Sequence, residues 1–215
     1  MSWRRSPVDA VGALVFEPVF ANAVDSRSPR SVCRVLGIDP GLTRCGYAVI
    51  DGRGATKASA ISIGVITTPP TDPLPQRLAA LRTEFTALIA EFGPDVVAVE
   101  QVFFQVNVRT AMSVGQASGL ALAEAALAGC EVIQYTPNQV KDAVAGWGGA
   151  NKEQVQKMVQ ARLGLSTLPK PADAADAAAL ALCHLAMSPA MSPRARASRT
   201  ARGDGSNTTP RERSA

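Results

Sequence analysis

Four acidic residues stand in three apolar segments, and they are the side chains of this sequence best suited to chemistry. Asp39 follows the apolar run RVLGI, and Glu100 closes the run PDVVAVE. Asp173 and Asp176 lie in the alanine-rich segment PADAADAAALALCHLAM, residues 171–187. A carboxylate beside a hydrophobic core is costly unless something compensates its charge. Hard cations such as Mg²⁺ compensate clustered carboxylates, and a pair of such ions suits the cutting of a phosphodiester bond.

Each acid taken singly has a simpler explanation. Asp39 before Pro-Gly is a common turn residue, Glu100 can end a strand, and the Asp173/Asp176 pair suits the start of any helix. Three such sites in one chain are more specific. The two aspartates are three residues apart and share a helix face, and open α/β sheets bind ligands where their strands end. We therefore expect the four acids to meet at one edge of a sheet.

The elements that must position these acids are predicted from hydrophobic periodicity. Strands are predicted over 34–40, 47–51, 58–66, 96–100 and 131–136, with a turn over 40–46. Helices are predicted over 74–93, 107–129, 136–146, 151–165 and 171–187. This order indicates an α/β sandwich with a mixed five-stranded sheet flanked by helices.

The basic excess of the chain lies in its ends. The net charge is +4, yet residues 35–187 carry 11 Lys and Arg against 13 Asp and Glu. We expect one globular domain over 34–187, an extension over 1–33 that is disordered or follows a mis-assigned start, and a disordered arginine-containing tail over 188–215. A nucleic-acid surface on the domain must therefore come from local arrangement, not from bulk charge.

Cysteine usage and hydropathy indicate a cytoplasmic protein without a membrane anchor. The four cysteines are far apart and form no CxxC pair. We interpret them as reduced thiols, with a zinc site disfavoured. No apolar run reaches the roughly 18 residues of a spanning helix.

Five motifs carry a resemblance to a known family: LGIDPGLTRCGYAVID, VAVEQVFF, RTAMSVGQASGLAL, YTPNQVKDAVAGWGGANKEQVQKMV and ADAADAAALALCH. In order and spacing they resemble the RuvC Holliday-junction resolvases of bacteria, over about residues 34–187. The resemblance implies a ribonuclease-H-like fold and a homodimer that binds four-way junction DNA and nicks two strands symmetrically, in DNA recombination and repair. It also implies two Mg²⁺ ions per subunit, with Mn²⁺ as a substitute, and cooperation with the RuvA–RuvB branch-migration complex.

The same resemblance assigns roles to individual side chains. It implies that the metal-binding catalytic acids are Asp39, Glu100, Asp173 and Asp176. Two basic positions of the family match Lys141 and Lys152, and both could reach phosphate oxygens. Lys152 could also steady the transition state. The alternative for each lysine is a solvated surface residue.

Further residues near the motifs have two interpretations each. Phe103 matches a family position that stacks on an unpaired base, whereas we expect core packing for Phe104. Arg109 contacts phosphate or is a surface residue. Trp147 touches DNA or forms a hydrophobic plug, and His184 lies in the core or at its rim.

The small residues of 115–125 favour a dimer face, with close packing inside one subunit as the alternative.

Two other function classes stay open. One is an ATP-binding module of the actin and sugar-kinase type, which uses a strand–turn–strand opening similar to IDPGLTRCGYAVI, although this chain shows no second copy of it. The other is a catalytically idle DNA-binding protein, which four acids do not favour, because acids without a bound metal repel DNA.

Overall fold

The apolar runs of the sequence form one central sheet. A computed structural model describes residues 32–53, 57–102 and 108–188, and in it the strand order is β3–β2–β1–β4–β5. The strands are β1 (Cys33–Asp39), β2 (Arg44–Arg53), β3 (Lys57–Thr67), β4 (Val96–Glu100) and β5 (Glu131–Tyr135). Strands β1, β2 and β3 pair antiparallel, whereas β1, β4 and β5 pair parallel. The predicted mixed sheet is confirmed.

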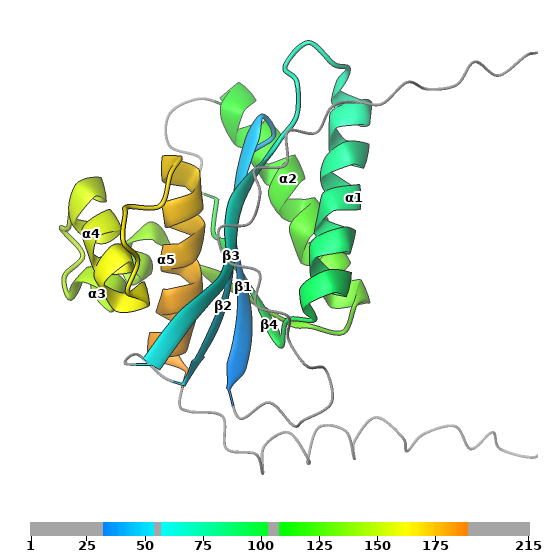
Figure 1. Ribbon diagram of the computed structural model, residues 1–215. Helices are drawn as coiled ribbons and strands as arrows, with labels where there is room; N and C mark the ends of the chain where they lie inside the picture. Colours follow the sequence, from blue (N-terminus) through cyan, green and yellow to red (C-terminus); the bar gives the residue numbers. More distant parts are fainter. Residues whose placement is uncertain (1–31, 54–56, 103–107, 189–215) are drawn as a thin grey trace, which may run out of the picture.

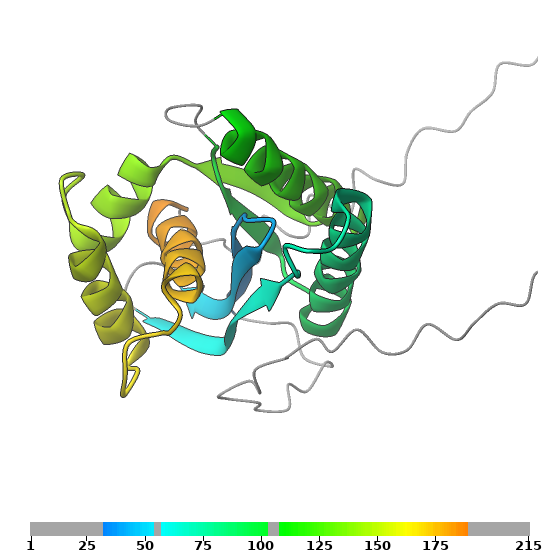
Figure 2. The same cartoon turned by 90° about the horizontal axis from the view of Figure 1, so that it is seen from above.

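Helices cover both faces of this sheet (Figures 1 and 2). One face carries α1 (Leu74–Phe92) and α2 (Val108–Leu127). The other carries α5 (Ala172–Met187), with α3 (Pro137–Ala145) and α4 (Lys152–Leu163) outside it. Within the described residues, no helix is both long and apolar enough to cross a membrane.

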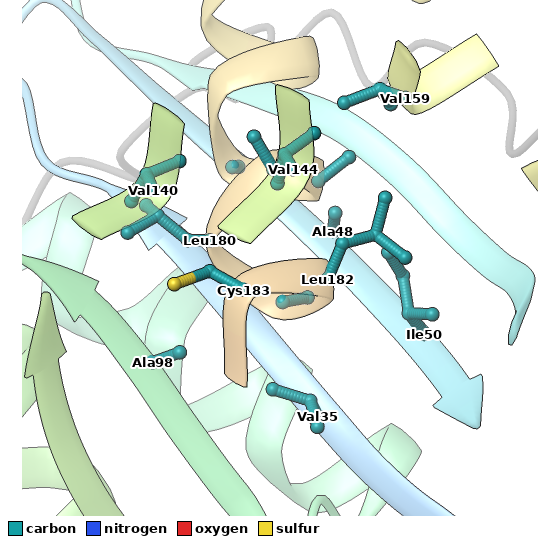
Figure 3. Packing of buried hydrophobic residues seen from close by; sticks show 14 of the residues in the cluster. Val35, Ala48, Ile50, Ala98, Val140, Val144, Val159, Leu180, Leu182 and Cys183 are labelled. Atoms are coloured by element: carbon teal, nitrogen blue, oxygen red, sulfur yellow. The ribbon is translucent and has the colours of Figure 1, made fainter. Parts of the chain in front are cut away.

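Strand alternation decides which helices each side chain meets. Val35 of β1 and Ala98 of β4 belong to the core beneath α5, together with Val144 of α3 (Figure 3). Their neighbours in sequence, such as Leu36 and Val99, pack with α1 and α2 instead. The same alternation carries on to the last residue of each strand, so it fixes the face on which the acids lie.

Two glycines let α5 lie very close to the sheet. A Cβ at Gly37 of β1 would stand 2.1 Å from the backbone oxygen of Ala177, and one at Gly46 of β2 would stand 2.0 Å from that of Asp173. Real side chains do not approach so closely, so both positions require glycine. The N-terminal half of α5 is thereby seated on the ends of β1 and β2.

The helices α3 and α4 begin where the sequence predicts. The Thr136 hydroxyl accepts a hydrogen bond from the Gln139 backbone N–H, and the Gln139 side-chain oxygen accepts one from the Thr136 backbone N–H. Asn151 and Gln154 repeat this arrangement. Such reciprocal caps satisfy backbone donors that the first turn leaves free. They fix the start of α4, and therefore the position of Lys152 directly after the cap.

Strand β2 differs from the sequence-based expectation. The segment 40–46 was predicted as a turn, but β2 begins at Arg44, which pairs with Thr67 of β3. The turn is therefore shorter than expected. It is held by Thr68, whose backbone N–H donates to the Thr43 oxygen over 3.1 Å. As a result Arg44 has a strand position and a defined face.

A buried ion pair fastens the opposite end of the sheet. Arg34 is buried and donates to both carboxylate oxygens of Asp51, each over 2.7 Å. It also donates to the backbone oxygen of Phe92 at the end of α1 over 2.9 Å. One side chain thus joins β1, β2 and α1.

The predicted extension over 1–33 and tail over 188–215 lie almost wholly outside the described residues, so that division of the chain stays a prediction.

Candidate active site

Two of the predicted acids end neighbouring parallel strands. Ile38 of β1 pairs with Val99 of β4, so Asp39 and Glu100 follow side by side at the carboxyl edge of the sheet. Both continue the alternation of Val35 and Ala98, whose side chains point toward α5. The strand ends therefore present both carboxylates on the face that α5 covers.

Helix α5 brings the other two acids to the same edge. Asp173 lies in its first turn, and its backbone rests against Gly46, the residue that pairs with Asp39. Asp176 follows one turn later. The charges of Glu100, Asp176 and Asp173 all act on Asp39. The structure thus gathers the four predicted acids around one point.

Asp39 has the most perturbed carboxyl group of the four. Burial raises its pKa, and the charges of Glu100, Asp176 and Asp173 raise it further, to about 7 against an ordinary value of 3.8. Lys152 opposes this shift. Near neutral pH this carboxyl group is therefore poised between its neutral and ionised forms. A nearby cation would favour the ionised form.

The pKa values of Glu100 and Lys152 are both raised, and the charge of Asp176 contributes to each shift. Burial and the charge of Asp176 raise the pKa of Glu100, while Lys152 lowers it. Burial lowers the pKa of Lys152, but its hydrogen bond with Asp176 and the charges of the nearby aspartates outweigh that, so the pKa is raised. Lys152 therefore stays protonated beside the acids at neutral pH.

Two of the four acids form ion pairs with basic side chains. Lys152 Nζ lies 2.5 Å from Asp176 Oδ2, and Arg44 Nη2 lies 2.8 Å from Asp173 Oδ2. Among the described residues, no group of three or more acidic, histidine or cysteine side chains is arranged to hold a metal ion as it stands. The donor set nevertheless fits a hard cation, because it consists of carboxylate oxygens that attract positive groups. A bound ion would compete with Arg44 and Lys152, each of which contacts the Oδ2 oxygen of its aspartate.

Arg44 is a site residue that the sequence did not reveal. Assigned to a turn, it had no predicted face. As the first residue of β2 it continues the alternation of Gly46 and Ala48 on the α5 side, which brings it to Asp173. Strand pairing with Thr67 was the signal needed to find it.

The predicted DNA-binding residues are only partly placed. Lys152 reaches the acids, as described above. Lys141 lies half-buried in α3, without an ion pair in the part of the chain that the structure describes. Phe103 and Phe104 lie outside the described residues. Arg109 belongs to α2, but its side chain is not among those described.

The structure resolves two choices that the sequence left open. Trp147 is 55% exposed, so it is not a hydrophobic plug. Its indole ring lies over Gly149, where a Cβ would come within 2.2 Å of Cζ3. His184 is a buried core residue whose Nδ1 lies 2.9 Å from the Tyr135 hydroxyl. Burial lowers the pKa of His184, which favours the neutral ring.

Residues 35–184 match the family model of crossover junction endodeoxyribonuclease RuvC. The chain belongs to the RuvC family. The RuvC of Salinispora arenicola is 55% identical over 152 residues, which cover 71% of this chain and 87% of that one. The RuvC of Leifsonia xyli subsp. xyli is 52% identical over 151 residues, which cover 70% and 73% of the two chains.

Solved structures give the same family. Thermus thermophilus RuvC in complex with Holliday junction substrate superimposes with a TM-score of 0.68 at 41% identity, covering 71% of this chain and 92% of that one. The yeast mitochondrial Holliday junction resolvase Ydc2 has a TM-score of 0.55 at 18% identity, with coverages of 71% and 78%, and shows the fold alone. The expected ribonuclease-H-like fold is confirmed. Family membership also favours a nuclease over an ATP-binding module.

Proposed function

We propose that this protein is a structure-specific endonuclease that resolves Holliday junctions by paired symmetrical nicks, in DNA recombination and repair. One observation carries the proposal: the charges of three acids from β4 and α5 converge on Asp39 at the end of β1, in a chain of the RuvC family. Four carboxylates in one place repel one another and DNA. Cation binding turns that arrangement into one that attracts phosphate.

The four acids would hold two Mg²⁺ ions per subunit, or Mn²⁺ in their place. When bound, these ions supply Lewis acidity to the attacking and leaving oxygens of the phosphodiester. Asp39 and Glu100 would act as ligands from the sheet edge, whereas Asp173 and Asp176 would approach from the helix that covers it. The burial that raises the pKa of Asp39 to about 7 also strengthens the attraction of its ionised form for a cation.

Basic and aromatic side chains would hold the DNA around this centre. Lys152, whose raised pKa keeps it charged, lies close enough to the acids to stabilise negative charge on the phosphate. Lys141 and Arg109 would bind phosphates further along the backbone, and Phe103 would stack on an unpaired base at the junction.

Two copies of the chain would act together. Helix α2 has two faces: Ala117, Ala121 and Ala125 are buried against its own subunit, whereas a Cβ at Gly119 would meet no described atom within 4 Å outside the adjacent backbone of its own helix. Met112 on the same helix is 60% exposed. This open small-residue face supports a homodimer, which sedimentation equilibrium would reveal as twice the mass of the chain. We further propose cooperation with the RuvA–RuvB complex in the cytoplasm.

The decisive assay is nicking of a synthetic four-way junction, compared with a linear duplex of the same sequence. We expect Mg²⁺-dependent cleavage of the junction only. Asp39→Asn and Glu100→Gln should lower the cleavage rate by at least about a thousandfold, because each removes a ligand charge from the metal centre. Both variants should keep junction affinity in a gel-shift assay.

The outcome also separates the competing functions. Junction binding without cleavage by the wild-type protein would favour a catalytically idle DNA-binding protein. Unchanged cleavage in either variant would remove the site assignment. Lys157→Gln is a matched control, because Lys157 pairs with Glu153 on the exposed surface of α4. This variant should cleave the junction as fast as the wild-type protein does.

A further inference from the structure

Arg44 holds Asp173 with two nitrogen atoms. Its Nε lies 2.9 Å and its Nη2 lies 2.8 Å from the same oxygen, Asp173 Oδ2. The two side chains are 48% and 30% exposed, so solvent reaches the pair. A positive group thus sits on one of the four acids at the place where a cation ligand is expected.

The backbone beneath Arg44 is fixed, but its side chain can leave. Arg44 pairs with Thr67 in the sheet. The preceding turn is braced by Arg77, whose guanidinium donates to Thr43 Oγ1 over 2.7 Å and to Thr68 Oγ1 over 2.9 Å. Only the long, half-exposed Arg44 side chain is therefore free to change partner. A guanidinium released here would still lie at the mouth of the acidic site.

We propose that Arg44 occupies Asp173 in the metal-free protein and is displaced by the divalent cation, which frees it to bind a phosphate of the DNA. This inference rests on the proposed metal-dependent nuclease function. Arg44 and the cation are both positive and are attracted to the same carboxylate, so each weakens the binding of the other. Asp173 is then never left uncompensated, because either the guanidinium or the cation covers its charge.

The exchange would link metal loading to DNA binding. Bound to Asp173 through Nε and Nη2, the Arg44 guanidinium has fewer donors left for phosphate, and the carboxylate beside it repels that phosphate. Once freed, its planar guanidinium can bind two phosphate oxygens at once. Metal-free protein would therefore hold DNA with one contact fewer on this side of the site than loaded protein does.

The first test measures metal binding without DNA. Mn²⁺ is titrated into wild-type protein and Arg44→Gln, and the free ion is followed by its electron paramagnetic resonance signal. We expect Mn²⁺ to bind Arg44→Gln about two- to fivefold more tightly, the scale of a solvent-exposed ion pair. Arg82→Gln is the matched control, because Arg82 makes a similar pair with Glu124, at 2.6 Å, between α1 and α2. Equal or weaker binding by Arg44→Gln would overturn the exchange.

The second test measures the salt dependence of junction binding by fluorescence anisotropy. It is run once with EDTA and once with Ca²⁺, a hard cation that takes the same oxygen ligands. With Ca²⁺, the slope of log affinity against log salt should be lower by about one for Arg44→Gln, as expected for one lost phosphate contact. With EDTA, the slopes of the two proteins should agree. A difference of the same size in both conditions would mean that Arg44 binds DNA regardless of metal, which contradicts the proposal.

The two failures can be told apart. If wild-type protein binds no Mn²⁺, the metal-dependent function fails and the exchange fails with it. If wild-type protein binds Mn²⁺ and Arg44→Gln binds it equally, only the exchange fails. Arg44→Lys keeps the charge and should return the Mn²⁺ affinity most of the way to the wild-type value.

Discussion

At the scale of single residues, the site is defined by the cost of placing like charges together. Asp39 carries the largest share of that cost, since burial and three neighbouring acids act on it at once. Lys152 and Arg44 offset part of it through their contacts with the α5 aspartates. Repulsion among these acids lowers the stability of the folded protein when no cation is bound, and cation binding raises it again.

The pH dependence of stability follows from the Asp39 carboxyl group. Its pKa is about 7 in the folded protein against 3.8 as the ordinary value, so the folded state binds this proton more tightly. The contribution to stability is complete below about pH 4 and is lost as the pH rises through about 7. In EDTA, Asp39→Asn should therefore be more stable than the wild type at pH 8, by on the order of 2 kcal/mol.

Urea unfolding at pH 5 and at pH 8 checks this expectation. The advantage of Asp39→Asn should shrink at pH 5, where the wild-type carboxyl group is mostly protonated. Adding Mg²⁺ at pH 8 should stabilise the wild type but not the variant. If Asp39→Asn were less stable than the wild type at pH 8 in EDTA, Asp39 would not be under the strain that we describe.

At the scale of elements, the site depends on how closely α5 lies on the sheet. Gly37 of β1 is one of the two narrowest points, because a Cβ there would stand 2.1 Å from the Ala177 oxygen and 3.0 Å from the Ala181 nitrogen. Both obstacles are backbone atoms, which cannot move aside without the helix. The acids at the start of α5 would move with it.

Gly37→Ala should therefore lower both stability and metal affinity. We expect a loss of about 3 kcal/mol in the free energy of unfolding, as for overpacking of a core. Mn²⁺ affinity should fall as well. Thr83→Ala in α1 is the control, because Thr83 is exposed, its hydroxyl donates to the Ala79 oxygen of its own helix, and alanine favours a helix. A Gly37→Ala protein with wild-type stability would refute the close seating of α5.

The sequence predicts these elements well where periodicity and caps are strong. The helices α3 and α4 begin one residue after Thr136 and Asn151, because both residues form reciprocal caps. The start of β2 at Arg44 was missed, since the Pro-Gly turn before it hides the strand pairing with Thr67. Arg44 was lost from the candidate site for the same reason. The contact of Arg44 with Asp173 spans 129 residues in sequence, and local patterns do not reveal such contacts.

At the scale of the whole molecule, the layers divide the tasks. The sheet edge and α5 form the acidic centre, α4 brings Lys152 to it, and α2 on the opposite face leaves a small-residue surface open. A dimer joined through α2 would leave both acidic centres free to act on separate strands of one junction. Paired nicks then require two sites of the same kind, held at a fixed separation.

The central claim is that Asp39, Glu100, Asp173 and Asp176 together bind divalent cations. The most direct measurement is the anomalous scattering of crystals soaked in Mn²⁺. We expect two manganese peaks among these four carboxylates, with the Arg44 guanidinium moved away from Asp173. Manganese bound elsewhere on the protein, with Asp173 still paired with Arg44 and Asp176 with Lys152, would contradict the claim.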